Sequence, residues 1–141
     1  MSDINPGRVV AGGLAAGVVM NVVDMLTNGV WLNAQWMDES KLLNIAVTPS
    51  SQTTAMTGWV TVDFLMGIAL VWLYAAIRPR FGPGPGTAIK AALAVFVVSH
   101  LVVASWWFNG LYSADLVMRC SLGGLVSALA GGLVGGLIYK E

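Results

Sequence analysis

Four ionisable side chains stand out because each lies inside a long apolar run of the sequence. They are Asp24, Asp63, His100 and Arg119. In a bilayer, such a charge costs about 2.5–3.5 kcal/mol even on insertion scales, so these residues usually face the protein interior and pair there. Acids, imidazoles and guanidinium groups inside membranes relay protons, bind ions or hold polar ligands. The four residues therefore predict either such a pathway or a set of polar contacts that fixes helix packing.

The positions of these residues predict one polar layer in the outer half of the membrane. Counting about 1.5 Å of rise per residue places all four in the outer half, with Arg119 nearest the outer boundary and His100 nearest the middle. Asn21 and Asn28 share a helix face with Asp24 and add hydrogen-bonding groups. The predicted layer contains Asp24, Asp63, His100, Arg119, Asn21 and Asn28. A salt bridge from Arg119 to one aspartate would leave the other aspartate without a basic partner. That second carboxyl group either pairs with a protonated His100 or keeps its own proton.

His100 has three interpretations. It is a hydrogen-bonded histidine within the packing, a proton-transfer group, or an axial ligand of a tetrapyrrole such as haem or chlorophyll. The sequence has one histidine and one cysteine, so it offers neither a second histidine ligand nor an internal disulfide. We find no nucleophile motif, phosphate-binding loop or metal-ligand cluster. We therefore predict a protein that is not an enzyme, with no catalytic residue, no metal and no cofactor.

The elements that position these residues are four apolar runs, at about 9–31, 57–77, 91–108 and 116–139. A membrane-spanning helix needs about 20 mostly apolar residues. The 141 residues are 57% hydrophobic and 10% charged, whereas a soluble domain is about 25% charged. Short connections make consecutive helices antiparallel neighbours. We expect one integral membrane domain, 1–141, with an all-α fold: a four-helix transmembrane bundle.

Local signals predict where these helices begin and end. Thr48 followed by Pro49 is typical of an N-cap with proline in the first turn, and Ser113 is a second candidate N-cap. The loop FGPGPG should stop both neighbouring helices. DESKLLNI, in the longest non-spanning segment, is expected to form one or two helical turns on the membrane surface.

The basic residues predict the orientation. One side of the predicted membrane carries Arg8, Arg78, Arg80, Lys90 and Lys140, whereas the other carries Lys41 and Arg119. Because lysine and arginine are enriched in cytoplasmic loops, we expect both termini in the cytoplasm. The formal net charge is zero, which gives no reason to expect a nucleic-acid partner.

Small residues predict how the helices meet. In lipid, helices associate through close van der Waals contact, which small side chains permit. Gly123, Ser127, Gly131 and Gly135 follow one another at a spacing of four, and Gly13 and Gly17 repeat that spacing in the first run. We predict that the first and fourth helices pack closely. The alternative is that one glycine face contacts another subunit.

Two segments carry a resemblance to a known group of proteins. VWLYAAIRPRFGPGPGTA resembles the inner loop of small, uncharacterised four-helix membrane proteins of bacterial genomes, and GRVVAGGLAAGVVMNVVD resembles their N-terminal helix. The resemblance covers about half of the chain. It implies a multi-pass protein of the bacterial inner (cytoplasmic) membrane, and nothing about chemistry.

Three functional hypotheses follow. The first is a non-catalytic accessory or self-associating subunit, whose partners are the lipid bilayer and other membrane subunits or further copies of the chain. The second is a small proton- or ion-coupled carrier or channel that uses the predicted polar layer. The third is a tetrapyrrole binder through His100.

Overall fold

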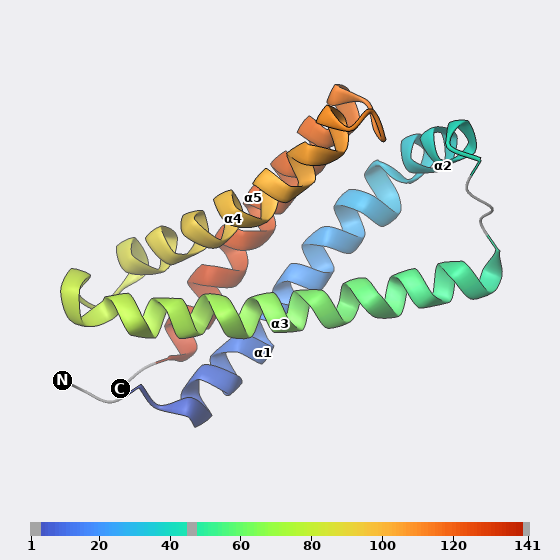
Figure 1. The fold of residues 1–141 in the computed structure, drawn as a ribbon. Helices are drawn as coiled ribbons and strands as arrows, with labels where there is room; N and C mark the ends of the chain where they lie inside the picture. The colour runs from blue at the N-terminus through green and yellow to red at the C-terminus, as the bar shows by residue number, and fades with distance from the viewer. Residues whose placement is uncertain (1–3, 45–47, 140–141) are drawn as a thin grey trace.

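The computed structural model describes residues 4–44 and 48–139, and within them the regular secondary structure is entirely helical (Figure 1). The elements are α1 (Pro6–Asp24), the π-helix η1 (Met25–Trp31), α2 (Asn33–Leu42), α3 (Pro49–Phe81), α4 (Pro85–Phe108) and α5 (Ala114–Ile138). Four helices are long and apolar enough to cross a membrane: Pro6–Trp31, α3, α4 and α5. The prediction of four helices of spanning length is confirmed, and they indicate a multi-pass membrane protein.

Capping residues set the helix boundaries. The hydroxyl of Thr48 accepts a hydrogen bond from Ser51 N–H at the start of α3, and the hydroxyl of Ser113 accepts one from Leu116 N–H at the start of α5. Gly82 ends α3 with φ of 81°, a backbone conformation that glycine adopts without strain. The cap at Thr48 makes α3 longer than the predicted 57–77, because its first two turns are polar.

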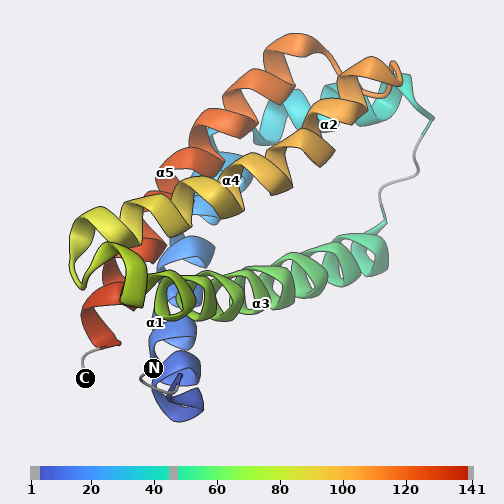
Figure 2. The same ribbon diagram turned by 60° about the vertical axis from the view of Figure 1, so that its left-hand side comes forward.

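The arrangement places α1 between α3 and α5, with α4 against the other flank of α5. Figures 1 and 2 show α3 crossing the other long helices steeply, so that its first half diverges from them. Every residue from 49 to 62 is accordingly exposed. The start of α1, the end of α5 and the α3–α4 loop lie at one end of the molecule, here called the inner end.

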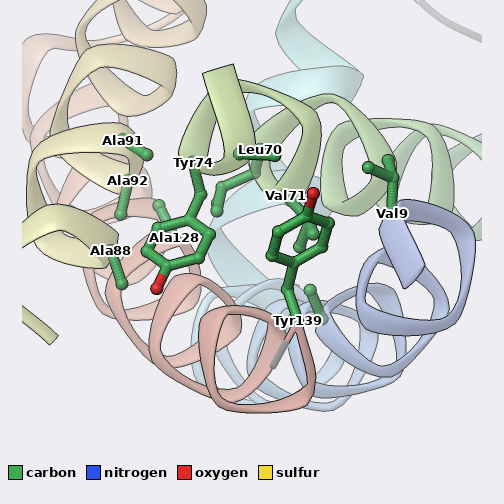
Figure 3. Packing of buried hydrophobic residues seen from close by; sticks show 11 residues of the cluster. Val9, Leu70, Val71, Tyr74, Ala88, Ala91, Ala92, Ala128 and Tyr139 are labelled. Carbon is green, nitrogen blue, oxygen red and sulfur yellow. The ribbon is translucent and has the colours of Figure 1, made fainter. Parts of the chain in front are cut away.

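The hydrophobic core lies toward the inner end and consists largely of small side chains (Figure 3). It contains Val9, Ala16, Leu70, Val71, Tyr74, Ala75, Ala88, Ala91, Ala92, Ala128 and Tyr139. The rings of Tyr74 and Tyr139 meet edge to face, with centroids 6.0 Å apart. Their hydroxyl groups accept hydrogen bonds from Gly84 N–H and Asn5 N–H, each at 3.2 Å. The two tyrosines therefore fasten the α3–α4 loop and the N-terminal segment to the core.

The glycines of α5 lie directly against α1. A Cβ on Gly123 would overlap Thr27, one on Gly131 would lie 2.8 Å from Met20 Cγ, and one on Gly135 would lie 3.1 Å from the Gly12 carbonyl oxygen. Ser127 on the same face donates to the Met20 carbonyl oxygen.

Gly13 and Gly17 face α3, not α5. A Cβ on Gly13 would lie 2.5 Å from Ile68 Cα, and one on Gly17 would lie 2.8 Å from Phe64 Cα. The sequence grouped these two glycines with the α5 contact. The difference arises because α1 contacts helices on two flanks, and successive residues on a helix are about 100° apart.

At the outer end, α2 is held on the start of α5. Glu39 accepts hydrogen bonds from the N–H and the hydroxyl of Ser113, and Gln35 donates to Asp115. Trp36 packs edge to face against Trp106 and Tyr112, at 6.3 and 5.0 Å. Burial raises the pKa of Glu39, but the hydrogen bonds from Ser113 and Gln35 outweigh it and lower the pKa from its usual 4.5.

Acidification is expected to loosen α2. A carboxyl group with a lowered folded-state pKa contributes stability above its unfolded pKa, and this is lost as the pH falls through the folded value. Lowering the pH from about 6 to about 3 should therefore release α2 and shift tryptophan emission, as Trp36 leaves its aromatic neighbours. Glu39→Gln is the control, since it cannot ionise. An equal shift in this variant would show that another group is responsible.

Candidate functional site

Two acids from different helices meet in the outer half of the molecule. Asp24 is the last residue of α1, and Asp63 on α3 is only 7% exposed. Their carboxyl groups lie close enough to influence each other, and Ser127 on α5 lies next to Asp24. α1 and α3 therefore each contribute one acid to a polar site, here called the acid pair (Asp24 and Asp63), and Ser127 of α5 lies beside it.

The acid pair lies at the same depth on both helices. Asp24 is 18 residues from Pro6, and Asp63 is 18 residues from Phe81, the inner ends of α1 and α3. At about 1.5 Å per residue this is about 27 Å of helix from the inner end. A hydrocarbon core about 30 Å thick that begins at these inner ends would contain the pair near its outer boundary.

A close helix crossing brings the two acids together. Gly67 lies one turn below Asp63, and a Cβ built on it would overlap the Gly13 carbonyl oxygen and lie 2.7 Å from Gly17 N. Glycine on both helices permits this backbone contact. Asn21 strengthens it, because its Nδ2 donates to the Gly17 carbonyl oxygen at 2.9 Å and to the Val60 carbonyl oxygen across the crossing at 3.4 Å.

The helix changes its hydrogen-bonding pattern immediately after Asp24. The π-helix η1 begins at Met25, and Leu32 N–H donates to the Thr27 carbonyl oxygen five residues back, at 2.8 Å. Such π segments occur frequently at functional sites. Asn28, within η1, accepts a hydrogen bond from Trp36 Nε1 at 3.1 Å. It therefore belongs to the contact with α2.

Arg119 and His100 lie apart from the acid pair. Arg119 Nε is 2.9 Å from a carboxylate oxygen of Asp115, one turn earlier on α5, and its side chain is about half exposed. His100 Nδ1 is 3.2 Å from the Phe96 carbonyl oxygen and 3.1 Å from Ser99 Oγ. On the other side of the ring, a Cβ on Gly124 would overlap Nε2.

The placement of His100 gives no support to tetrapyrrole ligation. Nδ1 has protein partners, and Nε2 is packed against α5, so neither nitrogen faces open space for a macrocycle.

The polar layer expected from the sequence is divided among four places. Asp24, Asp63 and Asn21 lie at the acid pair, Asn28 lies at the α2 contact, Arg119 pairs with Asp115, and His100 lies at the α4–α5 interface.

The chemistry of the acid pair follows from the close approach of its two carboxyl groups. An ionised carboxylate only accepts hydrogen bonds, so a hydrogen bond between two carboxyl groups needs a proton between them. Within residues 4–44 and 48–139, neither acid takes part in an ion pair. No group of three or more metal-ligating side chains is found in the same ranges. A proton shared by the two carboxyl groups would relieve their mutual repulsion, and no described residue supplies a compensating cation.

One contributor was not assigned to the polar layer from the sequence. Ser127 was interpreted as a packing residue, because it continues the small-residue spacing of Gly123 and Gly131. Its hydroxyl lies next to Asp24 and donates to the Met20 carbonyl oxygen. No protein-family model matches this sequence, and no curated protein or solved structure is significantly similar to it.

Proposed function

We propose that this chain is a small proton- or cation-coupled carrier or channel of the bacterial inner membrane, and that the acid pair is its proton-binding site. One observation carries the proposal: carboxyl groups of α1 and α3 meet within helices of spanning length, and no lysine or arginine among the described residues forms an ion pair with either acid. An ionisable residue at such a depth is expensive and usually functional.

The surroundings of the pair favour reversible proton binding. The pair lies where α3 leaves the other helices, just above the Gly67 crossing and just before η1. Losing the shared proton would place two negative charges in contact, which strongly disfavours that arrangement. The repulsion would act on the diverging part of α3, and proton loss would thereby be coupled to a movement of this helix.

We also propose the cytoplasmic orientation of both termini. Arg8, Arg78, Arg80 and Lys90 lie toward the inner end, together with the α3–α4 loop. Lys140, counted with them in the sequence, lies outside the described residues. The positive-inside tendency assigns this end to the cytoplasm.

A second candidate function is a self-associating, non-catalytic subunit. The glycine face of α5 gives it little support, because α1 and α4 cover that face within one chain. The support comes from α3, where Ser50, Thr54 and Gly58 follow a spacing of four along the exposed first half. That spacing permits close packing against the same helix of a second copy.

Proton flux in proteoliposomes tests the proposal. With an imposed pH gradient and an entrapped pH dye, Asp63→Asn should lower the flux at least about tenfold, since an amide cannot carry the proton. Asp38→Asn is the matched control, because Asp38 is an exposed acid whose partner is Lys41 at 2.9 Å. Equal flux in both variants would refute the role of the acid pair. A stable dimer with no flux in the unmodified protein would favour the subunit.

A further inference from the structure

A buried hydroxyl group of α5 lies beside the acid pair, on the side of Asp24. Ser127 is 1% exposed, and its Oγ lies 3.5 Å from the Met20 carbonyl oxygen of α1. In an α-helix the carbonyl group of residue 20 points along the axis toward the N–H of residue 24. The Ser127 hydroxyl therefore lies at the level of Asp24, and the Asp24 side chain is its neighbour there.

Asp63 has no such neighbour in the described part of the chain. It is 7% exposed, whereas Asp24 is partly exposed. Within residues 4–44 and 48–139, no hydroxyl or amide group donates to Asp63, and the group that influences it is the Asp24 carboxyl group. Burial disfavours the charged form of a carboxyl group, and a hydrogen bond to the carboxylate favours it. The two acids of the pair are therefore not equivalent.

The charged and titratable groups packed around the pair do not remove this difference. Arg119 on α5 pairs with Asp115, and His100 on α4 is packed against the backbone of α5. Cys120 on α5 lies close enough to Asp24 for their charges to influence each other. Its thiol is neutral near pH 7, because an ordinary thiol ionises at about pH 8.5. The Ser127 hydroxyl is therefore the group that distinguishes the two acids.

We propose that Ser127 decides which acid of the pair keeps the proton. The assignment rests on the proposed role of the acid pair in binding a proton. When the pair holds one proton, Asp24 is the carboxylate and accepts a hydrogen bond from the Ser127 hydroxyl. Asp63 is then the protonated acid, and it is the group that carries the transported proton.

The Ser127 hydroxyl changes its partner with the charge on Asp24. A hydroxyl group has one proton to donate, and a hydrogen bond to a carboxylate is stronger than one to a neutral carbonyl group. The hydroxyl therefore leaves the Met20 carbonyl oxygen when Asp24 ionises and returns to it when Asp24 is protonated. Ser127 is accordingly a positioning residue of the site.

Infrared spectroscopy of the full chain in lipid tests the assignment, because protonated and ionised carboxyl groups absorb at different frequencies. Each acid is titrated alone: Asp24 in the variant Asp63→Asn, and Asp63 in the variant Asp24→Asn. The double variant with both substitutions supplies the spectrum of all other acids. Asp24 should lose its proton about one pH unit below Asp63, since a hydrogen bond to a carboxylate shifts a titration by about that much.

Ser127→Ala identifies the cause of the difference. It should raise the titration of Asp24 by about one pH unit and leave that of Asp63 unchanged. In a chain with both acids it should raise the pH at which the first carboxylate forms, and this measurement does not depend on the folding of any acid variant. Ser121→Ala is the matched control on α5, because the Ser121 hydroxyl donates to the Val117 carbonyl oxygen at 2.8 Å. It should shift neither acid.

Equal titration of the two acids would overturn the assignment, and so would an equal shift of both by Ser127→Ala. The titration needs neither a pH gradient nor transport. If the unmodified protein gives no proton flux but the acids titrate as expected, the proposed function fails and the assignment stands. If flux is present but the two acids titrate alike, the assignment alone is wrong.

Discussion

Replacing Gly67 with alanine is expected to destabilise the protein more than any other single-methyl addition in α3. The added Cβ would collide with the Gly13 carbonyl oxygen and with backbone atoms of Gly17. Neither obstacle is a flexible side chain, so α1 and α3 must separate over their whole crossing. Overpacking of this kind costs about 3 kcal/mol. Thermal unfolding in detergent micelles measures the loss.

Gly58→Ala is the matched control on the same helix. Nothing lies within 4 Å of a Cβ at Gly58, so the substitution adds helix propensity without a collision. We expect unchanged or higher stability, by up to about 1 kcal/mol. A similar loss for both variants would mean that α1 and α3 do not touch at Gly67. Because the crossing also aligns the acid pair, Gly67→Ala should lower proton flux in any molecules that remain folded.

The local parts of this fold could be predicted because they depend on short-range chemistry. The caps at Thr48 and Ser113 and the helix stop before Gly82 each involve residues within one turn. The four apolar helices follow from length and composition. The π-helix was not predicted, since the stretch MLTNGVW contains nothing that distinguishes it from an α-helical continuation.

The composition of the site was harder to predict because it depends on helix rotation and crossing angle. Depth along the sequence grouped His100 and Arg119 with the two aspartates, whereas rotation about α4 turns His100 toward Gly124. The partner of Arg119 was within reach of sequence reasoning, since Asp115 lies four residues earlier on the same helix. The sequence placed Asp24 and Asp63 in one layer, but their contact without Arg119 was not predicted, because it depends on the close crossing at Gly67, a single glycine outside any small-residue repeat.

The second large effect is expected from removing one carboxyl group while leaving the other. Asp63→Leu leaves Asp24 facing an apolar side chain, and an unsatisfied buried polar group costs about 1–3 kcal/mol. Asp63→Asn should cost less than about 1 kcal/mol, because the amide still donates a hydrogen bond to the Asp24 carboxylate. Unfolding in detergent micelles should therefore rank Asp63→Leu well below Asp63→Asn and the unmodified protein.

The double variant Asp24→Leu, Asp63→Leu separates stability from function. Replacing both partners of a buried hydrogen bond by apolar groups can be nearly neutral, so the double variant should be more stable than Asp63→Leu alone. This positive coupling, about 2 kcal/mol, is the signature of two groups in contact. If the two single losses simply add, the carboxyl groups do not meet. If the double variant is stable in micelles but gives no proton flux in proteoliposomes, the fold needs neither acid. That result would establish that the pair is present for transport.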